Sequence, residues 1–276
     1  MRNESETPSA VAVTLLGSLR LVTFAGGRGF ITYRDFGDLN ESALRRSIPQ
    51  ALEHFQRNPT IGRVEWKTRA HDHAPGHHEA LLDSTFVADE PETIMIGDAA
   101  GLAVDLPLPD GIMLRTVVRE ADVRAMSAMQ DDVFGDPESD EMALQLLNRL
   151  AQNDGMQLWI AEAAGEIVSA GRLEPVPGTQ FAGIWGGATR KSWRGQGFYR
   201  ALTAARARAA LTMGKTLVHS DSTEHSRPIL ERSGLVAVST TTPYRWRRSP
   251  LRGSAVEGAL QEVGGGTISD ALVEVG

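Results

Sequence analysis

Residues 193–202 read WRGQGFYRAL, and the interpretation of the whole chain depends on this stretch. Gly195 and Gly197 stand one residue apart, Arg194 precedes them, and an alanine-rich segment that predicts a helix follows. Glycines let successive backbone N–H groups point into one concavity, and the first turn of a helix presents unpaired N–H groups to an anion. The stretch therefore predicts either a phosphate-binding loop or a plain turn that leads into a helix.

Two other phosphate-binding motifs compete for the same residues. A Walker loop needs a glycine at the position of Arg190, so this motif is excluded. A dinucleotide-binding fingerprint would use Gly195 and Gly197 with a third small residue, and Asp221 would bind the ribose. Arg200 stands at that third position. A nucleotide-binding oxidoreductase stays open as one alternative.

The residues around the loop predict a mixed pattern of strands and helices. Apolar spacing and turn residues indicate a strand, two helices, a three-strand antiparallel meander, the loop with its helix, a strand, a short helix and a last strand. Gly186 and Gly187 suit a bulge that pushes two parallel strands apart and leaves a V-shaped gap. The expected ranges are 112–118, 120–133, 138–152, 158–163, 166–173, 181–189, 198–213, 216–221, 226–233 and 235–246.

This order of elements, together with the R-x-x-G-x-G-like run, resembles the GNAT superfamily, the Gcn5-related N-acetyltransferases. The resemblance covers roughly half of the chain, and G-x-G alone is a weak signal. It implies an α/β fold with a mixed central sheet flanked by helices, and acetyl-CoA as the cosubstrate. It also implies an acetyltransferase that modifies an amine. The residues implied to bind the cofactor are Ala188, Thr189, Arg194, Gly195, Gln196, Gly197, Phe198 and Tyr199.

The sequence departs from the family pattern at three positions. Tyr199 stands where the loop usually ends in glycine or alanine. Leu230 stands where the family often has a tyrosine that protonates the departing thiolate, and Thr223 replaces the usual asparagine. The acid that protonates the thiolate is therefore another residue, a water molecule, or absent. His225 and Tyr244 are the other residues that could act as this acid. A non-catalytic acyl-CoA-binding or scaffold protein is accordingly the leading alternative function.

His219 and Asp221 are the candidates for the catalytic base. They alternate along one predicted strand, so their side chains face the same side, near the end of the strand beside the gap. The alternative is a packed strand histidine and an aspartate that caps a turn or helix. For the carbonyl oxygen that gains charge, the Ala188 amide at the bulge is the expected donor.

Other charged residues are assigned to solvent. The segment HDHAPGHH contains His71, His73, His77 and His78, which we interpret as solvated turn histidines because no carboxylate pattern completes a metal site. No metal is expected. The three arginines of the helix after the loop are interpreted as a solvated face rather than a clamp for the 3′-phosphate of CoA; they are Arg200, Arg206 and Arg208.

The segment before residue 104 contains an echo of the last part of the chain. The sequence ALLDSTFVADEPET (80–93) matches ILERSGLVAVSTTT (229–242) at a constant offset of 149 residues. The match indicates a duplication and is similar to the layout of tandem GNAT enzymes. We expect a flexible tail at 1–10, a degenerate GNAT-like domain at 11–103, a linker at 104–111, the GNAT domain at 112–250 and a second tail at 251–276.

Composition limits the partners. The 276 residues carry a formal net charge of −7 at pH 7, which argues against nucleic acid or an anionic membrane as the main partner. No apolar run approaches the ~20 residues needed to cross a bilayer. The absence of cysteine and of a signal-peptide core predicts a cytoplasmic protein. The acceptor is expected to be a small-molecule or peptide amine, and monomer and homodimer both stay open.

Overall fold

The computed structural model describes residues 7, 9–36 and 40–249, so most of both predicted tails lies outside the described residues. Within this range, twelve strands form one sheet in the order β1-β2-β3-β4-β12-β6-β11-β10-β9-β8-β7, with β5 paired to β12. The strands are β1 (Ala10–Leu16), β2 (Leu19–Phe24), β3 (Arg28–Tyr33), β4 (Arg63–Arg69), β5 (Val87–Ala88), β6 (Glu92–Asp98), β7 (Ile112–Val117), β8 (Gln157–Ala163), β9 (Glu166–Pro175), β10 (Phe181–Thr189), β11 (Leu217–Ser222) and β12 (Val236–Arg247).

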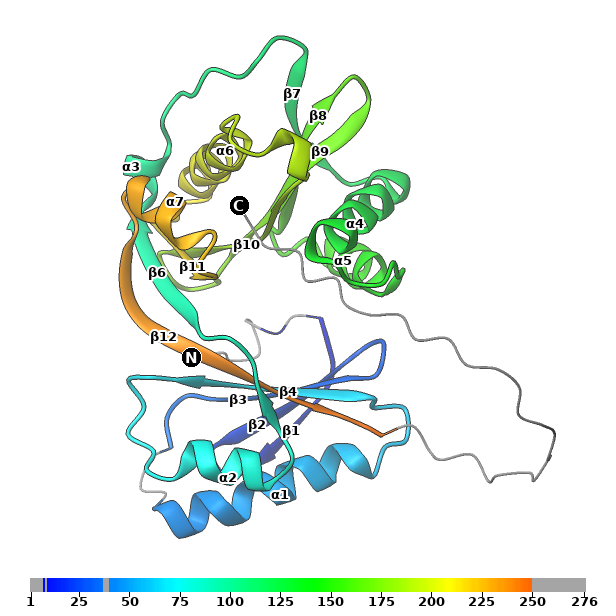
Figure 1. Cartoon of the computed structure of the whole chain (residues 1–276), viewed down its shortest axis with the longest axis vertical. Coiled ribbons are helices and arrows are strands. Elements are labelled where there is room, and N and C mark those ends of the chain that lie inside the picture. Colours follow the sequence, from blue (N-terminus) through cyan, green and yellow to red (C-terminus); the bar gives the residue numbers. More distant parts are fainter. Residues whose placement is uncertain (1–6, 8, 37–39, 250–276) are drawn as a thin grey trace, which may run out of the picture.

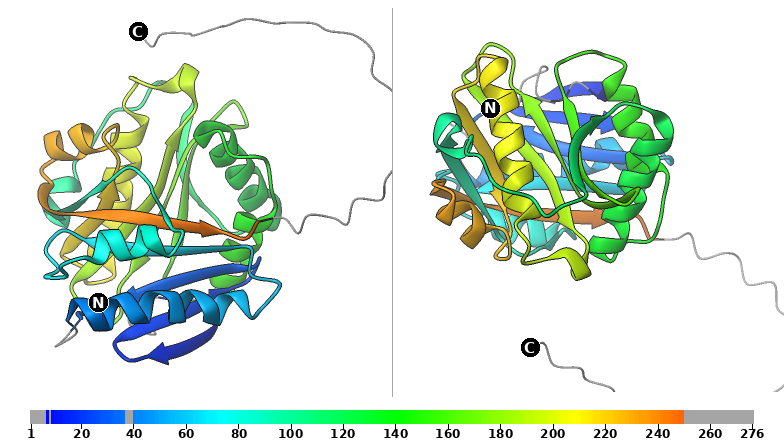
Figure 2. Two further views of the ribbon diagram at one scale, coloured as in Figure 1. Left: turned by 60° about the horizontal axis from the view of Figure 1, so that its bottom comes forward. Right: turned by 90° about the horizontal axis from the view of Figure 1, so that it is seen from above.

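Helices cover both faces of the strongly curved sheet (Figure 1). Helices α4 and α6 both contact β9 and β10 but belong to different hydrophobic clusters, so they lie on opposite faces (Figure 2, right). This is the mixed α/β fold that the sequence predicts. The helices are α1 (Glu41–Gln56), α2 (His77–Asp83), α3 (Ala99–Leu102), α4 (Glu120–Phe134), α5 (Glu141–Leu150), α6 (Phe198–Thr212) and α7 (Arg227–Arg232), with a 3₁₀ turn at Lys191–Trp193.

The two ends of the chain repeat one order of elements. In the first series, the antiparallel meander β1–β3 is followed by α1, β4, α2 and β5–β6. In the second series, the antiparallel meander β8–β10 is followed in the same way by α6, β11, α7 and β12. In both series the last meander strand pairs in parallel with the strand after the long helix. The 149-residue offset carries Val87 and Asp98, the ends of β5–β6, onto Val236 and Arg247, the ends of β12. The sequence echo therefore coincides with equivalent structural elements.

The last strand of each series lies within the other series. Strand β12 pairs with β6 through residues 236–241 and with β4 through residues 241–247. Strand β6 in turn pairs with β11, so it separates β11 from β12. Figure 1 shows β12 crossing the molecule between the upper and lower groups of elements. The sequence predicts β12 as a strand, but nothing in its own residues indicates this exchange.

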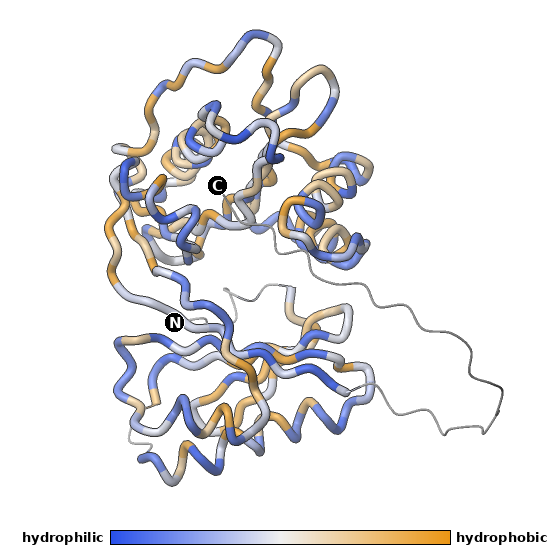
Figure 3. The backbone as a smooth tube through the Cα atoms, in the orientation of Figure 1, coloured by the Kyte–Doolittle hydropathy of each residue, from blue (hydrophilic) through white to orange (hydrophobic). Residues whose placement is uncertain are grey.

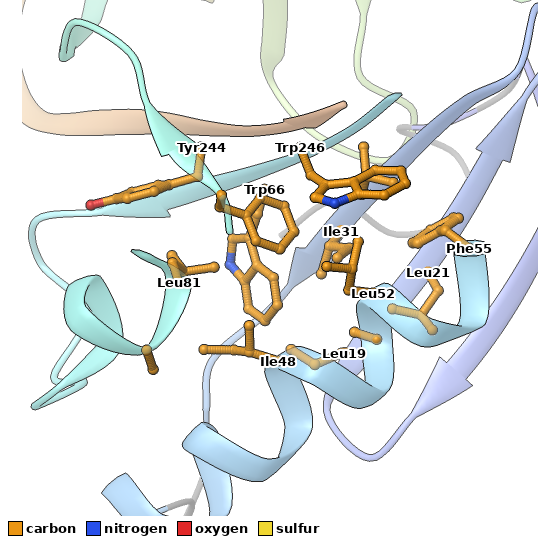
Figure 4. Packing of buried hydrophobic residues seen from close by; sticks show 14 of the residues in the cluster. Leu19, Leu21, Ile31, Ile48, Leu52, Phe55, Trp66, Leu81, Tyr244 and Trp246 are labelled. Atoms are coloured by element: carbon orange, nitrogen blue, oxygen red, sulfur yellow. The ribbon is translucent and has the colours of Figure 1, made fainter. Parts of the chain in front are cut away.

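Each hydrophobic core contains residues from both series. The core beneath α1 and α2 includes Trp66 and Ile48, and β12 contributes Tyr244 and Trp246 to it (Figure 4). The core beneath α6 and α7 includes Met95 from β6. Helix α1 alternates hydrophobic and hydrophilic residues along its length (Figure 3), as expected for a helix with one buried face. Because a large buried side chain contributes ~1.5–3 kcal/mol, neither core is complete without the other series.

The histidine-rich segment corrects one expectation. His77 is buried rather than solvated, because the rings of Tyr33, Phe36 and Trp66 surround it at centroid distances of 6.2, 4.9 and 5.3 Å. Its Nε2 atom has no hydrogen-bond partner in the described part of the chain. His71, His73 and His78 are exposed, as the sequence predicts, and His71 Nδ1 lies 2.7 Å from Ser239 Oγ.

Burial of His77 makes stability depend on pH. Desolvation by burial lowers the pKa of His77 from 6.5 to about 4. Between these two pH values the unfolded chain binds more protons at this histidine than the folded chain does. The stability of the folded state is therefore at its full value above pH ~6.5 and decreases as the pH falls towards ~4. We expect the free energy of unfolding to fall by about 3 kcal/mol across this window. Urea unfolding at a series of pH values should show this fall in the free energy of unfolding for the native protein and for the control His73→Gln. The fall with pH should be smaller for His77→Phe. An unchanged fall in His77→Phe would assign it to other groups.

Candidate functional site

The central strands β10 and β11 separate soon after they begin to pair. Their parallel pairing covers only Phe181 with Leu217, Ala182 with Val218, and Gly183 with His219, although both strands continue further. Beyond this point the backbone pairing stops, and a side-chain hydrogen bond takes its place: Ser220 Oγ donates to the carbonyl oxygen of Ile184 at 3.1 Å. The V-shaped separation that the glycines of β10 predict is therefore present.

A bulge in β10 follows directly. Trp185 lies opposite Arg172 and Ala188 lies opposite Ala170, so Gly186 and Gly187 together face one residue of β9. Gly186 has a φ of +59°, which glycine adopts without strain. The side-chain amide of Gln130 in α4 donates a hydrogen bond to the Gly186 carbonyl oxygen at 2.5 Å. The predicted bulge is confirmed, and the sequence did not identify Gln130 as its support.

Gly187 contacts the first turn of α6. A Cβ atom at this position would lie 2.6 Å from Cε2 and 3.3 Å from the hydroxyl oxygen of Tyr199. Any larger residue would therefore displace the Tyr199 ring. Residues Ala188 and Thr189 continue β10, where Ser169 Oγ lies 2.8 Å from both the Ala188 carbonyl oxygen and Thr189 Oγ1. The bulge, Tyr199 and two of the residues implied to bind the cofactor, Ala188 and Thr189, thus form one contiguous group.

The glycine loop joins this group to the start of α6. Gly195 and Gly197 have φ values of +76° and +86°, and a Cβ atom added to either glycine would meet no other atom within 4 Å. Gly197 is the N-cap of the 15-residue helix α6, so the N–H groups of its first turn are directed out of the helix end. Gln196 is exposed, whereas Phe198 is buried and packs against Trp193 at a centroid distance of 5.6 Å. An anion could reach this helix end through open space.

The two arginines near the loop have different environments. Arg194 is exposed, and its Nε donates a hydrogen bond to the Thr189 carbonyl oxygen at 3.1 Å, which ties the loop to the end of β10. Arg190 forms ion pairs with Asp132 at 3.0 Å and Glu166 at 3.1 Å. The charge of Arg190 is therefore already neutralised, and Arg194 is the better placed of the two for an anion at the loop.

A cavity of about 480 Å³ lies between the two series of elements. Strands β3 and β4 contribute one wall, and β9, β10 and β11 contribute another, with α5 beside them. His219 and Asp221 both line it, together with Trp185 of β10. The prediction that the two β11 side chains share a side is confirmed, because their neighbours Val218 and Ser220 are buried on the other face.

His219 and Asp221 have different contacts in this cavity. The His219 ring packs edge-on against Trp185 at a centroid distance of 5.2 Å and against Phe181 at 5.9 Å. Asp221 accepts a hydrogen bond from Lys67 Nζ at 2.9 Å, and Lys67 also pairs with Glu92 at 2.6 Å. Lys67 belongs to β4, so this ion-paired group joins the two series. Its position follows from the strand exchange and could not be predicted from local sequence.

The residues that stand at the family's acid positions do not supply an acid. Leu230 is fully buried in the core beneath α6 and α7, and Thr223 is exposed. Of the two alternatives, His225 is exposed, and Tyr244 lies in the other core with its hydroxyl group hydrogen-bonded to His78. Tyr244 therefore does not lie beside the separated strands.

Tyr199 places a hydroxyl group close to these positions. Its side chain extends from the first turn of α6 past Gly187, and its hydroxyl group lies towards Ser226 at the start of α7. Desolvation by burial is the main cause that raises the pKa of Tyr199 above 10, so the phenol stays protonated at neutral pH. The sequence shows the unusual residue at this loop position but not where its hydroxyl group lies.

One of the three helix arginines corrects another expectation. Arg206 is buried rather than solvated, with 1% of its surface exposed. Its Nε donates to the Leu202 carbonyl oxygen at 3.1 Å and its Nη1 to the Arg172 carbonyl oxygen at 3.3 Å. Burial lowers the pKa of Arg206 to about 10. Arg200 and Arg208 are exposed, as predicted.

Neither a metal cluster nor a membrane-spanning helix is found among the described residues. In residues 7, 9–36 and 40–249, no group of three His, Cys, Asp or Glu side chains is placed to hold a metal ion. Over the same residues, no helix has the length and apolar character needed to span a membrane.

Comparison with known proteins agrees with this geometry. Residues 123–235 match the family model described as the acetyltransferase (GNAT) family. A GCN5-related N-acetyltransferase from Kribbella flavida is similar in structure, with a TM-score of 0.61, 15% identity, and coverage of 86% of this chain and 90% of that chain. A tandem GNAT protein from the clavulanic acid biosynthesis pathway has a TM-score of 0.58 and 13% identity, with 84% and 79% of the two chains covered. No curated protein matches the sequence.

Residues 123–235, which match the GNAT family model, contain the bulge, the glycine loop and the strand with His219. At these identities the solved structures show the fold alone, and they share it over most of the chain, including the first series of elements.

Proposed function

We propose that the protein is an N-acetyltransferase that transfers an acetyl group from acetyl-CoA to an amine. The observation that carries this proposal is the early end of β10–β11 pairing, directly before the bulge and the glycine loop. An extended chain can take the place of a strand where two strands separate, and the start of α6 offers N–H groups to a pyrophosphate. A cytoplasmic location is part of the same proposal and rests on the cysteine-free composition.

The residues that would hold the cofactor follow the path from loop to bulge. The backbone at Gly195–Tyr199 would bind the phosphates, with Arg194 contributing charge. Ala188 and Thr189 would pair with the pantetheine arm along β10. Bound acetyl-CoA would supply an activated thioester carbonyl, and the Ala188 N–H is the donor that we assign to the carbonyl oxygen.

The amine must lose a proton to react, because a free alkylamine has a pKa of ~10. We assign His219 as the proton acceptor, because it lines the cavity and is the last residue of β11 that pairs with β10. Asp221 is instead assigned to holding Lys67, since this ammonium group occupies one of its carboxylate oxygens. In the transfer, the C–N bond forms, the C–S bond breaks and the amine proton passes to His219.

Tyr199 is the residue that we propose as the proton donor to the departing thiolate. Its hydroxyl group lies between the bulge and the start of α7, in the region where the family tyrosine would extend from α7. The buried phenol is protonated at neutral pH, so its O–H group can donate to the sulfur as negative charge develops there. Because the ordinary pKa of a thiol, ~8.5, is below that of the phenol, this donation assists the departure of the thiolate but is not strictly required for it. The loop residue that departs from the family pattern would thus compensate for Leu230.

Tyr199→Phe tests this assignment. Phenylalanine keeps the ring that packs against Gly187 and removes only the hydroxyl group. Because a general acid typically contributes ~10²–10⁴-fold, we expect kcat to fall by ~10²-fold, at the low end because a thiolate leaves readily, with little change in CoA affinity measured by calorimetry. The loss should shrink with an acetyl donor whose leaving group is a selenolate, since a better leaving group needs less protonation.

Ser226→Ala is the matched control, because it removes the neighbouring hydroxyl group and leaves the Tyr199 hydroxyl group in place. Its kcat should stay within a few-fold of the native value. If Tyr199→Phe has native kcat, or loses the same factor with both donors, the hydroxyl group does not protonate the leaving group.

Release of free thiol from acetyl-CoA in the presence of a panel of amines tests the overall proposal. Amine-dependent release above the spontaneous rate supports an enzyme. Micromolar binding of acetyl-CoA without release for any amine would favour the alternative, a non-catalytic acyl-CoA-binding protein of the same fold.

We further propose that residues 11–103 are a degenerate GNAT-like copy, joined through 104–111 to the active domain at 112–250. The repeated order of elements and the 149-residue offset support a duplication. The segment between β3 and α1 contains a single glycine and no R-x-x-G-x-G run, so we assign no phosphate site to it. One CoA per chain in a calorimetric titration is the result that this assignment requires.

A further inference from the structure

The cavity between the two series contains a cation that has no ion-pair partner among the described residues. Arg28 begins β3 and lines the cavity wall. Across this part of the chain it forms no ion pair, and its buried Nε has no hydrogen-bond partner. The guanidinium carbon lies 4.1 Å from the centroid of the Phe24 ring, which holds the group in a cation–π contact. Burial is the main cause that lowers the pKa of Arg28.

The nearby carboxylates of the described chain leave Arg28 without a hydrogen bond. Glu65 is adjacent on β4 and interacts with Arg28 only through charge. Glu141 is engaged by Arg63 and by Gln145. Arg28 is only partly exposed, so its charge is incompletely hydrated, and an anion that accepts from the accessible N–H groups of its fixed fork would stabilise it.

A second guanidinium group lies near the bulge. Arg172 of β9 also lines the cavity, and its positive charge acts on Arg28. Its Nε donates to Glu174 at 2.6 Å, whereas Nη1 would lie 3.4 Å from a Cβ atom at Gly186. Glu174 is shared with Arg149 at 2.5 Å. Two guanidinium groups therefore line the cavity; of the carboxylates near them, Glu174 is shared by two arginines and Glu65 forms no hydrogen bond with Arg28.

We propose that the acceptor is a small amine that also carries a carboxylate, bound by Arg28 with Arg172 beside it, and that its amine lies towards His219. This inference rests on the proposed acetyltransferase function and names the substrate class. A cavity of about 480 Å³ matches the usual size of small-molecule sites and suits an amino acid or a dipeptide. The carboxylate accepts two parallel hydrogen bonds from Arg28, a geometry that a lone amine cannot use.

The test compares amines of one skeleton that differ only at the anionic end. For the native protein we expect amino acids or dipeptides to have a lower KM than their carboxamides. Arg28→Gln should raise the KM of the carboxylates by about 10- to 100-fold and leave the carboxamides unchanged. Arg28→Lys should recover part of the loss because it restores the charge. Arg46→Gln, an exposed arginine on α1, is the matched control and should change neither.

Binding measured without turnover separates this inference from the proposed function. Calorimetry of the same ligands with the CoA-saturated protein should show Arg28-dependent binding of carboxylates even if no thiol is released. Thiol release with equal KM for carboxylates and carboxamides in native protein would support the enzyme and overturn the substrate class. The substrate class would also be overturned, in favour of a phosphate ligand, if aminoalkyl phosphates bind more tightly than the carboxylates and this binding depends on Arg28. Native unfolding temperature in Arg28→Lys confirms that the fold is intact.

Discussion

The limited pairing between β10 and β11 is the constraint on which the candidate site depends. Two parallel strands normally continue to pair for as long as they lie side by side, yet here pairing ends at Gly183 and His219. The bulge at Gly186 and Gly187 maintains the separation, with Gln130 bonded to the Gly186 carbonyl oxygen on one side. On the other side Tyr199 packs against Gly187. The positive φ favours glycine at position 186, and the Tyr199 contact excludes a side chain at position 187. The backbone of β10 and the start of α6 therefore lie close together.

The strand exchange positions the second part of the site. Strand β6 lies between β11 and β12, and β12 pairs with β4. Lys67 of β4 reaches Asp221 of β11, and the walls of the cavity come from both series. Each core also contains side chains of the other series, such as Met95 and Tyr244. The two series are therefore expected to unfold together rather than as independent domains, since separation would expose both cores. The proposed degenerate copy would then serve mainly to build the acceptor side of the cavity.

Local patterns in the sequence report local structure, so much of the second series could be predicted. Apolar spacing and turn residues identified the elements after residue 110 to within a few residues, and Gly186, Gly187, Gly195 and Gly197 indicated the bulge and the loop. The family match and the similar solved structures confirm the resemblance that these residues carried. Features that depend on contacts between distant segments could not be predicted: His77 is buried because Tyr33, Phe36 and Trp66 come together around it. The Lys67–Asp221 pair likewise follows from the strand exchange, which leaves no periodic signal in the chain.

Amide hydrogen exchange with and without CoA tests the central claim most directly, because the claim concerns backbone N–H groups. We expect slower exchange at Gly187–Thr189 and Gly195–Tyr199 when CoA is bound, and no change in β3, α1 or β4. Protection in that first series, or CoA binding that leaves the amides of the bulge and the loop unprotected, would contradict the proposed site.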